Sequence, residues 1–247
     1  MDRKIRVAAV SYLNTKPLIY GFEKGMMEEE VSLITEFPSG IADLLINDAV
    51  DIGLVPIAVL PLLREYHIIS NYCIGTEGEV ASVCLFSDVP LAEVKTILLD
   101  YQSRSSVALL KILLRDHWKA DPRIVPGIPG YEATIEGSVA GLVIGDRAFA
   151  QRKKNKYAYD LGLAWKELTG LPFVFAAWVA NKKLPEDFTS AFNDATGYGL
   201  KHLSEVISEN PYAEYDLQEY YTNNISYELT DEKRVGMEVF LQKIQYL

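Results

Sequence analysis

Short apolar runs alternate with amphipathic segments along the first third of the chain. The apolar runs predict buried strands over residues 4–11, 31–37, 51–54, 68–74 and 80–87. Helical spacing of apolar residues predicts a helix that begins near Pro17 and another over residues 41–50, for which Ser39 is the expected N-cap. This order of elements favours a parallel or mixed sheet with helices on both faces.

A second series of strands and helices begins near Pro90. Strands are predicted over residues 96–99, 141–145 and 173–179, and an apolar helix is predicted to follow residue 106. From Pro185 onward the pattern is helical without a strand, so we expect this tail to pack back on the first series. The predicted fold class is therefore α/β, with two lobes around a ligand cleft. We expect residues 1–88 and 180–247 to form the first lobe and residues 89–179 the second.

Composition and charge narrow the classes of protein to which the chain can belong. Of the 247 residues 49% are apolar, and 34 acidic residues outnumber 24 basic ones, which gives a formal net charge of -10. Such fractions are typical of folded globular proteins and exclude disordered, collagen-like and coiled-coil classes. The acidic balance argues against nucleic-acid and membrane partners, which would require a basic surface. An anionic ligand would need a site that supplies its own positive potential.

The N-terminal segment and the cysteines predict a cytoplasmic protein. The apolar run after the first charged residues covers only residues 7–10, which is too short for the core of a signal peptide. No apolar stretch approaches the ~18–20 residues of a membrane-spanning helix. Cys73 and Cys84 do not make a disulfide framework, and buried free thiols are the simpler interpretation.

Polar residues gather where the predicted strands of the first lobe end. Asn14 follows the first strand, and its amide could orient a hydroxyl or a carboxylate; a turn in which Thr15 caps the next helix is an equally good interpretation. Ser39, Pro56 and Ile57 follow the second and third strands, where an ordinary cap and loop explain them more simply. Ligands of α/β proteins bind at the carboxyl ends of the strands, so these five residues all remain candidate binding residues.

The start of the apolar helix in the second lobe is the sharpest local signal. Ser103, Ser105 and Ser106 bring three hydroxyls to a helix N-terminus, where free N–H groups and the helix dipole already favour anions. Arg104 could add a bidentate contact to a carboxylate. One cap needs only one hydroxyl, so anion binding is favoured over an over-capped helix with Arg104 in solvent.

Two further polar positions fall within or at the end of apolar strands. Ser82 is explained either by a hydrogen bond within its own strand or by a place in the site. Gly145 and Asp146 close the strand over residues 141–145. Asp146 could accept a hydrogen bond from a ligand hydroxyl or cap the next helix.

The chain carries no motif for a metal, a nucleotide or a covalent nucleophile. His67, His117 and His202 are too scattered to pair as metal ligands. The sequence has no Gly-x-Gly-x-x-Gly, no P-loop and no nucleophile elbow. We therefore predict no metal and no cofactor, and His67 stays only as a candidate base.

Five separated motifs, in order, identify a family. SYLNTKPL (11–18), GLVPIAVLPLL (53–63), SVCLFS (82–87), LDYQSRSSVALLKILL (99–114) and TGLPFVFAAW (169–178) resemble the chorismate dehydratases of the futalosine route to menaquinone. The resemblance covers residues 5 to about 180. It implies a cytoplasmic enzyme with a type II periplasmic-binding-protein-like fold.

The resemblance also implies a reaction and roles for the candidate residues. The reaction is the dehydration of chorismate, a dianionic small molecule, to 3-[(1-carboxyvinyl)oxy]benzoate, with no cofactor. Asn14 and Ser82 would orient the reacting centre, and residues 103–106 would hold a substrate carboxylate. The cleft would also be lined by Thr15, Ser39, Pro56, Ile57, Gly145 and Asp146. No side chain of these motifs is an obvious base, so the enolpyruvyl carboxylate of the substrate is our candidate.

Three alternatives remain open at this point. A solute-binding protein of the same fold would require export, and a ligand sensor would require a DNA-binding segment that this acidic chain does not show. The later dihydroxynaphthoate synthase of the same pathway matches the motifs less well. The sequence does not determine the oligomeric state.

Overall fold

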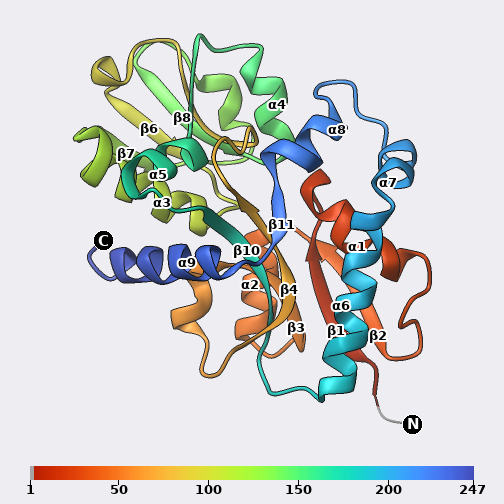
Figure 1. Cartoon of the computed structure of the whole chain (residues 1–247). Helices are drawn as coiled ribbons and strands as arrows, with labels where there is room; N and C mark the ends of the chain where they lie inside the picture. The colour runs from red at the N-terminus through yellow and green to blue at the C-terminus, as the bar shows by residue number, and fades with distance from the viewer. Residues whose placement is uncertain (1–2) are drawn as a thin grey trace.

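The strands of the chain are divided between two mixed sheets. The computed structural model describes residues 3–247. The first sheet contains, in spatial order, β11 (Ser226–Glu228), β4 (His67–Thr76), β10 (Phe173–Ala180), β3 (Ile52–Pro56), β1 (Ile5–Val10) and β2 (Val31–Glu36). The second contains β7 (Arg123–Pro126), β6 (Thr96–Leu99), β8 (Val139–Ile144), β5 (Val83–Ser87) and β9 (Tyr157–Asp160). Figure 1 shows the two sheets in separate parts of the molecule, each with its own helices.

The first sheet is built around a parallel core. Strands β1, β2 and β3 pair in parallel, and helices α1 (Lys16–Glu23) and α2 (Pro38–Ile46) make the crossovers between them. Strand β10 then pairs antiparallel with both β3 and β4. All five residues of β3 are buried, as expected of a strand covered on both faces. The predicted mixed sheet with flanking helices is confirmed.

The second sheet repeats this plan on a smaller scale. Strand β6 pairs in parallel with β7 and β8, whereas β5 is antiparallel to β8 and β9. Three helices accompany these strands, namely α3 (Ser105–Leu113), α4 (Asp146–Arg152) and α5 (Leu161–Thr169). The apolar residues of α3 are buried along most of the helix, which fits its unbroken apolar sequence.

Two strands belong to the sheet opposite to the one expected from the chain order. Strand β5 falls before residue 88, yet it pairs only with strands of the second sheet. Strand β10 falls before residue 180, yet it pairs with strands of the first. Both strands are buried at every residue, so an apolar pattern identifies them as strands without revealing their partners. The division into lobes by residue number stays a prediction, and the pairing shows only that β5 joins the second sheet and β10 the first.

The C-terminal tail lies against elements of the first sheet and also reaches the second lobe. Helix α6 (Glu186–Lys201) lies against α1, at a spacing that requires glycine, because a Cβ at Gly21 would lie 2.2 Å from the carbonyl oxygen of Ala195. Helix α9 (Asp231–Ile244) places Phe240 edge-on to Phe173 of β10 and to Trp165 of α5. Figure 1 shows α6 beside α1 and α9 crossing near β10.

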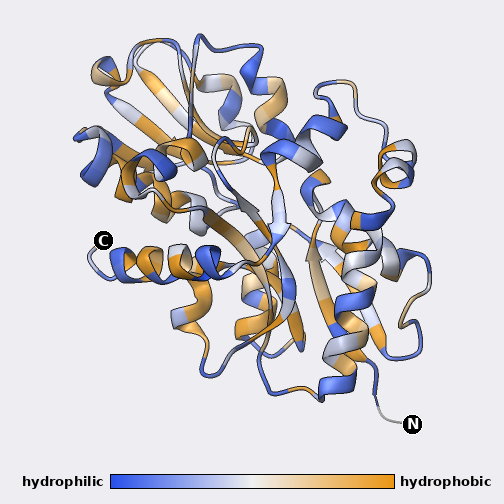
Figure 2. Ribbon diagram, viewed as in Figure 1, coloured by the Kyte–Doolittle hydropathy of each residue, from blue (hydrophilic) through white to orange (hydrophobic). Residues whose placement is uncertain are grey.

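The middle of the tail differs from the helical expectation. After α7 (Leu203–Glu209) and α8 (Leu217–Glu219), a π-helical turn over Tyr220–Asn224 leads into the short strand β11, which pairs with β4. Three residues of strand are too few to produce a recognisable alternation in the sequence. Figure 2 shows mainly hydrophobic residues along the central strands and hydrophilic residues interspersed with hydrophobic ones along the helices.

Two further observations bear on the class of protein. Within residues 3–247, no helix is both long and apolar enough to cross a bilayer. Cys73 and Cys84 are buried free thiols, which confirms their predicted state. Burial raises the pKa of the Cys73 thiol to about 12, so it stays protonated and unreactive at neutral pH.

Candidate active site

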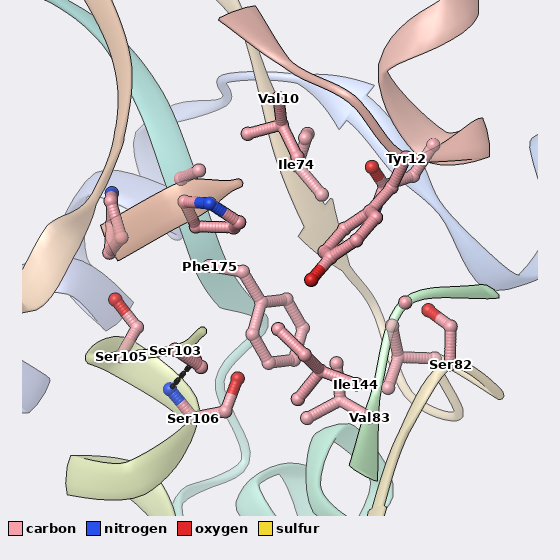
Figure 3. Close-up of a pocket in the computed structure, with 16 residues that line it drawn as sticks. Val10, Tyr12, Ile74, Ser82, Val83, Ser103, Ser105, Ser106, Ile144 and Phe175 are labelled. Atoms are coloured by element: carbon pink, nitrogen blue, oxygen red, sulfur yellow. Dashed lines mark hydrogen bonds between the residues drawn. The ribbon is translucent and has the colours of Figure 1, made fainter. Parts of the chain in front are cut away.

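A pocket of about 470 Å³ lies where the two sheets face each other. Its walls come from the carboxyl ends of β1, β3 and β8, the starts of α2 and α3, the segment before β5, and strands β4 and β10. It is lined by Val10, Tyr12, Asn14, Pro38, Pro56, Ile74, Val80, Ser82, Val83, Ser103, Ser105, Ser106, Ile144, Gly145, Phe175 and Ala176. In Figure 3 the serines of α3 and Ser82 lie on opposite sides of the ring of Phe175.

Seven of the twelve candidate residues line this pocket. They are Asn14, Pro56, Ser82, Ser103, Ser105, Ser106 and Gly145. They come from five separate segments of the chain, and the interlobe pocket brings them together. The other five, Thr15, Ser39, Ile57, Arg104 and Asp146, lie around the pocket without lining it.

Arg104 does not extend into the pocket. Its Nη2 donates to Oδ1 of Asp43 on α2 at 2.6 Å, and about a third of its side chain is exposed. The expectation that it would grip a carboxylate there therefore has no support in this geometry. Arg104 precedes the first helical residue, and the nearby carboxylate of Asp43 in the other lobe captures its side chain.

Ser39 and Thr15 have structural rather than lining roles. Helix α2 begins at Pro38, so its N-cap is Phe37 and the expected cap by Ser39 is wrong; the Ser39 hydroxyl donates to the carbonyl oxygen of Tyr101 at 3.4 Å. Thr15 is the N-cap of α1 by position, but its Oγ1 donates to Oδ1 of Asn14 at 3.2 Å instead of capping. Thr15 thus stands behind Asn14 and orients its amide.

Ile57 and Asp146 also differ from their expected roles. Ile57 is fully buried in the core, where it begins the 3₁₀ turn after β3. Asp146 is the first residue of α4, and its carboxylate accepts the backbone N–H of Leu13 at 3.1 Å, across the interface between the lobes. Burial raises the pKa of Asp146 to about 6.

Ser82 follows a strained turn that hydrogen bonds with Asp160 and Arg152 hold in place. The preceding residue, Ala81, has a φ of 62°, which is unusual for a residue with a Cβ. Asp160 accepts the N–H groups of Val80 and Ala81, and Nε of Arg152 donates to the Ala81 carbonyl at 2.9 Å. The Ser82 hydroxyl has its partner outside its own strand, because the hydroxyl of Tyr220 donates to Ser82 Oγ at 2.7 Å.

Asn14 is held from behind by tyrosines of the C-terminal tail. It sits in the 3₁₀ turn Leu13–Thr15 and is 8% exposed. Tyr227 donates to the carbonyl oxygen of Asn14 at 2.8 Å, and Tyr221 donates to that of Leu13 at 3.0 Å. The carbonyl groups of this turn are thereby satisfied, so the Asn14 side chain is available to the pocket.

The pocket serines present donors rather than acceptors. Ser105 Oγ accepts the N–H of Ala58 at 3.1 Å, and Ser103 Oγ accepts the N–H of Ser106 at 3.1 Å. A hydroxyl oxygen that already accepts a bond leaves its own hydrogen to donate elsewhere. Together with the N-terminus of α3, these hydroxyls give the pocket a positive character without a cationic side chain.

Tyr12 closes one side of the pocket and was not among the candidates. Figure 3 shows its hydroxyl directed into the hollow. That hydroxyl donates to Gln102 Oε1, which also accepts Nη2 of Arg147 at 2.9 Å. Burial raises the pKa of Tyr12 well above its usual value, so the phenol stays neutral.

The residues missed by the sequence reasoning left some signals. Tyr12 lies two positions before Asn14 in the same polar segment after β1. The tail tyrosines form a dense group, since residues 212–227 contain five of them. Such clustering indicates a shared role but does not reveal which distant segment the hydroxyls reach.

Comparison with known proteins agrees with this architecture. A chorismate dehydratase from Thermus thermophilus is 26% identical over 94% of this chain and 92% of its own length. Among solved structures, protein AF1704 from Archaeoglobus fulgidus aligns with a TM-score of 0.75 at 14% identity, over 98% of this chain and 97% of that one. A Candida albicans protein described as having the generic periplasmic-binding-protein fold aligns with a TM-score of 0.64 at 15% identity, over 99% and 91%.

A profile of the menaquinone biosynthesis family matches residues 5–246, nearly the whole described chain. The structural likenesses establish a two-lobed, periplasmic-binding-protein-like fold. The profile match identifies, in addition, the family. By this match, the chain belongs to the menaquinone biosynthesis family.

Proposed function

We propose that this protein is a carbon–oxygen hydro-lyase that dehydrates chorismate to 3-[(1-carboxyvinyl)oxy]benzoate. The observation that carries the proposal is the interlobe pocket, in which Asn14 and Ser82 share a cavity with the three serines at the start of α3. Membership of the menaquinone biosynthesis family and the similarity to a chorismate dehydratase support it. The unpaired thiols of Cys73 and Cys84 suit a reducing compartment, so we place the reaction in the cytoplasm.

The chemistry requires loss of one proton and one hydroxyl from neighbouring ring carbons. The proton leaves the carbon that bears the enolpyruvyl ether, and its electron pair can delocalise through the adjacent double bond into the ring carboxylate. The hydroxide then departs, combines with a proton to give water, and leaves an aromatic ring. The protein therefore has to hold two carboxylates, stabilise the one that gathers charge, and exclude water.

The pocket offers donors that suit these tasks. The hydroxyls of Ser103, Ser105 and Ser106, at the N-terminus of α3, would hold one carboxylate. The Asn14 amide and the Ser82 hydroxyl would donate to the charge or the leaving hydroxyl at the reacting centre. The apolar parts of the wall would contact the two faces of the ring and keep water away.

A base is not evident among the side chains of the pocket. Within residues 3–247, no Asp, Glu, His, Lys or Cys contributes to the pocket wall. His67, the earlier candidate, pairs with Glu65 at 2.6 Å outside the pocket. Tyr12 lines the pocket, but burial raises its pKa and keeps it protonated. We therefore assign proton removal to the enolpyruvyl carboxylate of the substrate, which hangs beside the carbon that loses the proton.

Two experiments test the proposal. Purified protein incubated with chorismate should produce the absorbance of an aromatic product, and tight binding without conversion would instead indicate a ligand-binding protein. A chorismate analogue with an amide in place of the enolpyruvyl carboxylate should bind without turning over. Normal turnover of that analogue would contradict substrate-assisted proton removal.

A further inference from the structure

Tyr220 connects the C-terminal tail to the pocket without lining it. It is fully buried at the start of the π-helical turn after α8, and its hydroxyl donates to Ser82 Oγ at 2.7 Å. Its ring is fixed edge-on against Phe149 of α4, with centroids 5.0 Å apart at 89°. Tyr215 of the tail also packs edge-on against the ring of Tyr220, with the two ring centroids 6.1 Å apart. The hydroxyl of Tyr220 is therefore held at one place beside Ser82.

The environment of Tyr220 keeps its hydroxyl protonated. Burial raises the pKa of the phenol far above its usual value, and the nearby carboxylate of Asp146 raises it further. The side chains of Ser82 and Asn14 lie close enough to lower that pKa, but burial outweighs them. Tyr220 is consequently neutral at every pH at which the protein would be assayed.

The direction of this hydrogen bond decides what Ser82 can do. A serine hydroxyl has one hydrogen, and its oxygen here is occupied by the hydrogen of Tyr220. Among residues 3–247, the structure gives the Ser82 hydrogen no acceptor. Ser82 lines the pocket, so its hydrogen is left for whatever occupies that space.

We propose that Tyr220 is a positioning residue for the dehydration, because its bond to Ser82 Oγ aims the Ser82 hydrogen into the pocket beside Asn14. This inference rests on the proposed function. Without Tyr220 the Ser82 hydroxyl could rotate and satisfy its oxygen and hydrogen in other directions. Tyr220 thereby joins the folded tail to Ser82, while Tyr227 of the same tail donates to the carbonyl oxygen of Asn14.

The test compares Tyr220→Phe with the wild-type protein in the conversion of chorismate. We expect kcat to fall about tenfold, as loss of one well-placed hydrogen bond does, while KM changes less than about twofold. The effect should act through Ser82, so Tyr220→Phe should change kcat by less than about twofold in a Ser82→Ala background. Titration of active sites with the aromatic product corrects each rate for any unfolded fraction.

Tyr215→Phe is the matched control. It removes a tyrosine hydroxyl from the same aromatic cluster, but that hydroxyl bonds Asn224 Oδ1 at 3.0 Å and does not contact Ser82. We expect its kcat to equal that of the wild type. A Tyr220→Phe protein with wild-type kcat, or one that loses as much kcat in the Ser82→Ala background, would overturn the positioning role.

The outcomes separate this inference from the proposed function. If the wild-type protein does not convert chorismate, the proposed function fails and the role of Tyr220 fails with it. If the wild-type protein is active and the Tyr220 effect is missing, only the positioning role fails. Should Tyr220→Phe not fold, Ser82→Ala still decides, because unchanged kcat in that variant would remove the group through which Tyr220 acts.

Discussion

Replacement of Gly145 by alanine probes the packing of the pocket wall. Gly145 lies between β8 and α4 with φ 63° and ψ -151°, a backbone conformation that is nearly exclusive to glycine. A Cβ at this position would also lie 2.8 Å from the ring of Tyr12. The substitution therefore combines backbone strain with a steric overlap inside the pocket.

The expected loss of stability follows from these two contributions. Backbone strain in this region costs about 1–3 kcal/mol, and overpacking of a buried wall costs about 1–3 kcal/mol more. We expect Gly145→Ala to lower the free energy of unfolding by about 2–6 kcal/mol, which lowers Tm by on the order of 10 °C for a chain of this size. It should also lower kcat/KM for chorismate, because the displaced Tyr12 ring intrudes on the substrate volume.

The matched control is Gly170→Ala at the end of α5. Gly170 also has a positive φ of 74°, but a Cβ there would meet nothing within 4 Å. This variant should lose only about 1–2 kcal/mol and keep its activity. In a Tyr12→Ala background, the destabilisation caused by Gly145→Ala should lose the contribution from steric overlap and keep the contribution from backbone strain. Equal destabilisation by Gly145→Ala and Gly170→Ala, with no dependence on Tyr12, would refute the reasoning.

Three further substitutions test individual assignments. Asn14→Ala should reduce kcat by on the order of 10²–10³ if the amide acts on developing charge, and an unchanged rate would remove it from the catalytic group. Arg104→Ala should leave KM for chorismate within about twofold, because its partner is Asp43 on an exposed face and such pairs contribute about 0–1 kcal/mol; a large rise in KM would return Arg104 to the pocket. Burial raises the pKa of Asp146 to about 6, so its ionisation penalises the fold increasingly as pH rises from about 4 through 6. Asp146→Asn should therefore raise Tm at pH 8 and leave it nearly unchanged at pH 4.5, and a Tm difference independent of pH would contradict this assignment.

The local chemistry of the binding edge could be recognised from the sequence. Asn14, Ser82 and the serines at residues 103–106 each follow or interrupt an apolar strand, or begin a helix. Parallel strands bring such positions to one edge of a sheet, so their convergence was predictable without knowing the partners of each strand. The α/β class was predictable for the same reason, since apolar runs and helical spacing are properties of neighbouring residues.

Side-chain direction was not predictable in the same way. Arg104 and Ser103 are adjacent in sequence, but Ser103 lines the pocket and Arg104 pairs with Asp43 of α2. That choice depends on the position of a carboxylate from another lobe. The N-cap expected at Ser39 was wrong for a different reason, because helix α2 already begins at Pro38 and Ser39 therefore lies inside it.

The sequence by itself determined which segments are strands or helices and which of their ends carry polar groups. Only the tertiary structure decided that β5 pairs in the second sheet and β10 in the first. It alone also decided that the hydroxyl of Tyr220 bonds Ser82, a residue 138 positions away. The physical reason is one of range. Periodicity and helix starts depend on contacts within one or two turns of chain, whereas strand pairing and buried hydrogen bonds depend on groups that meet only when both lobes and the tail have packed together.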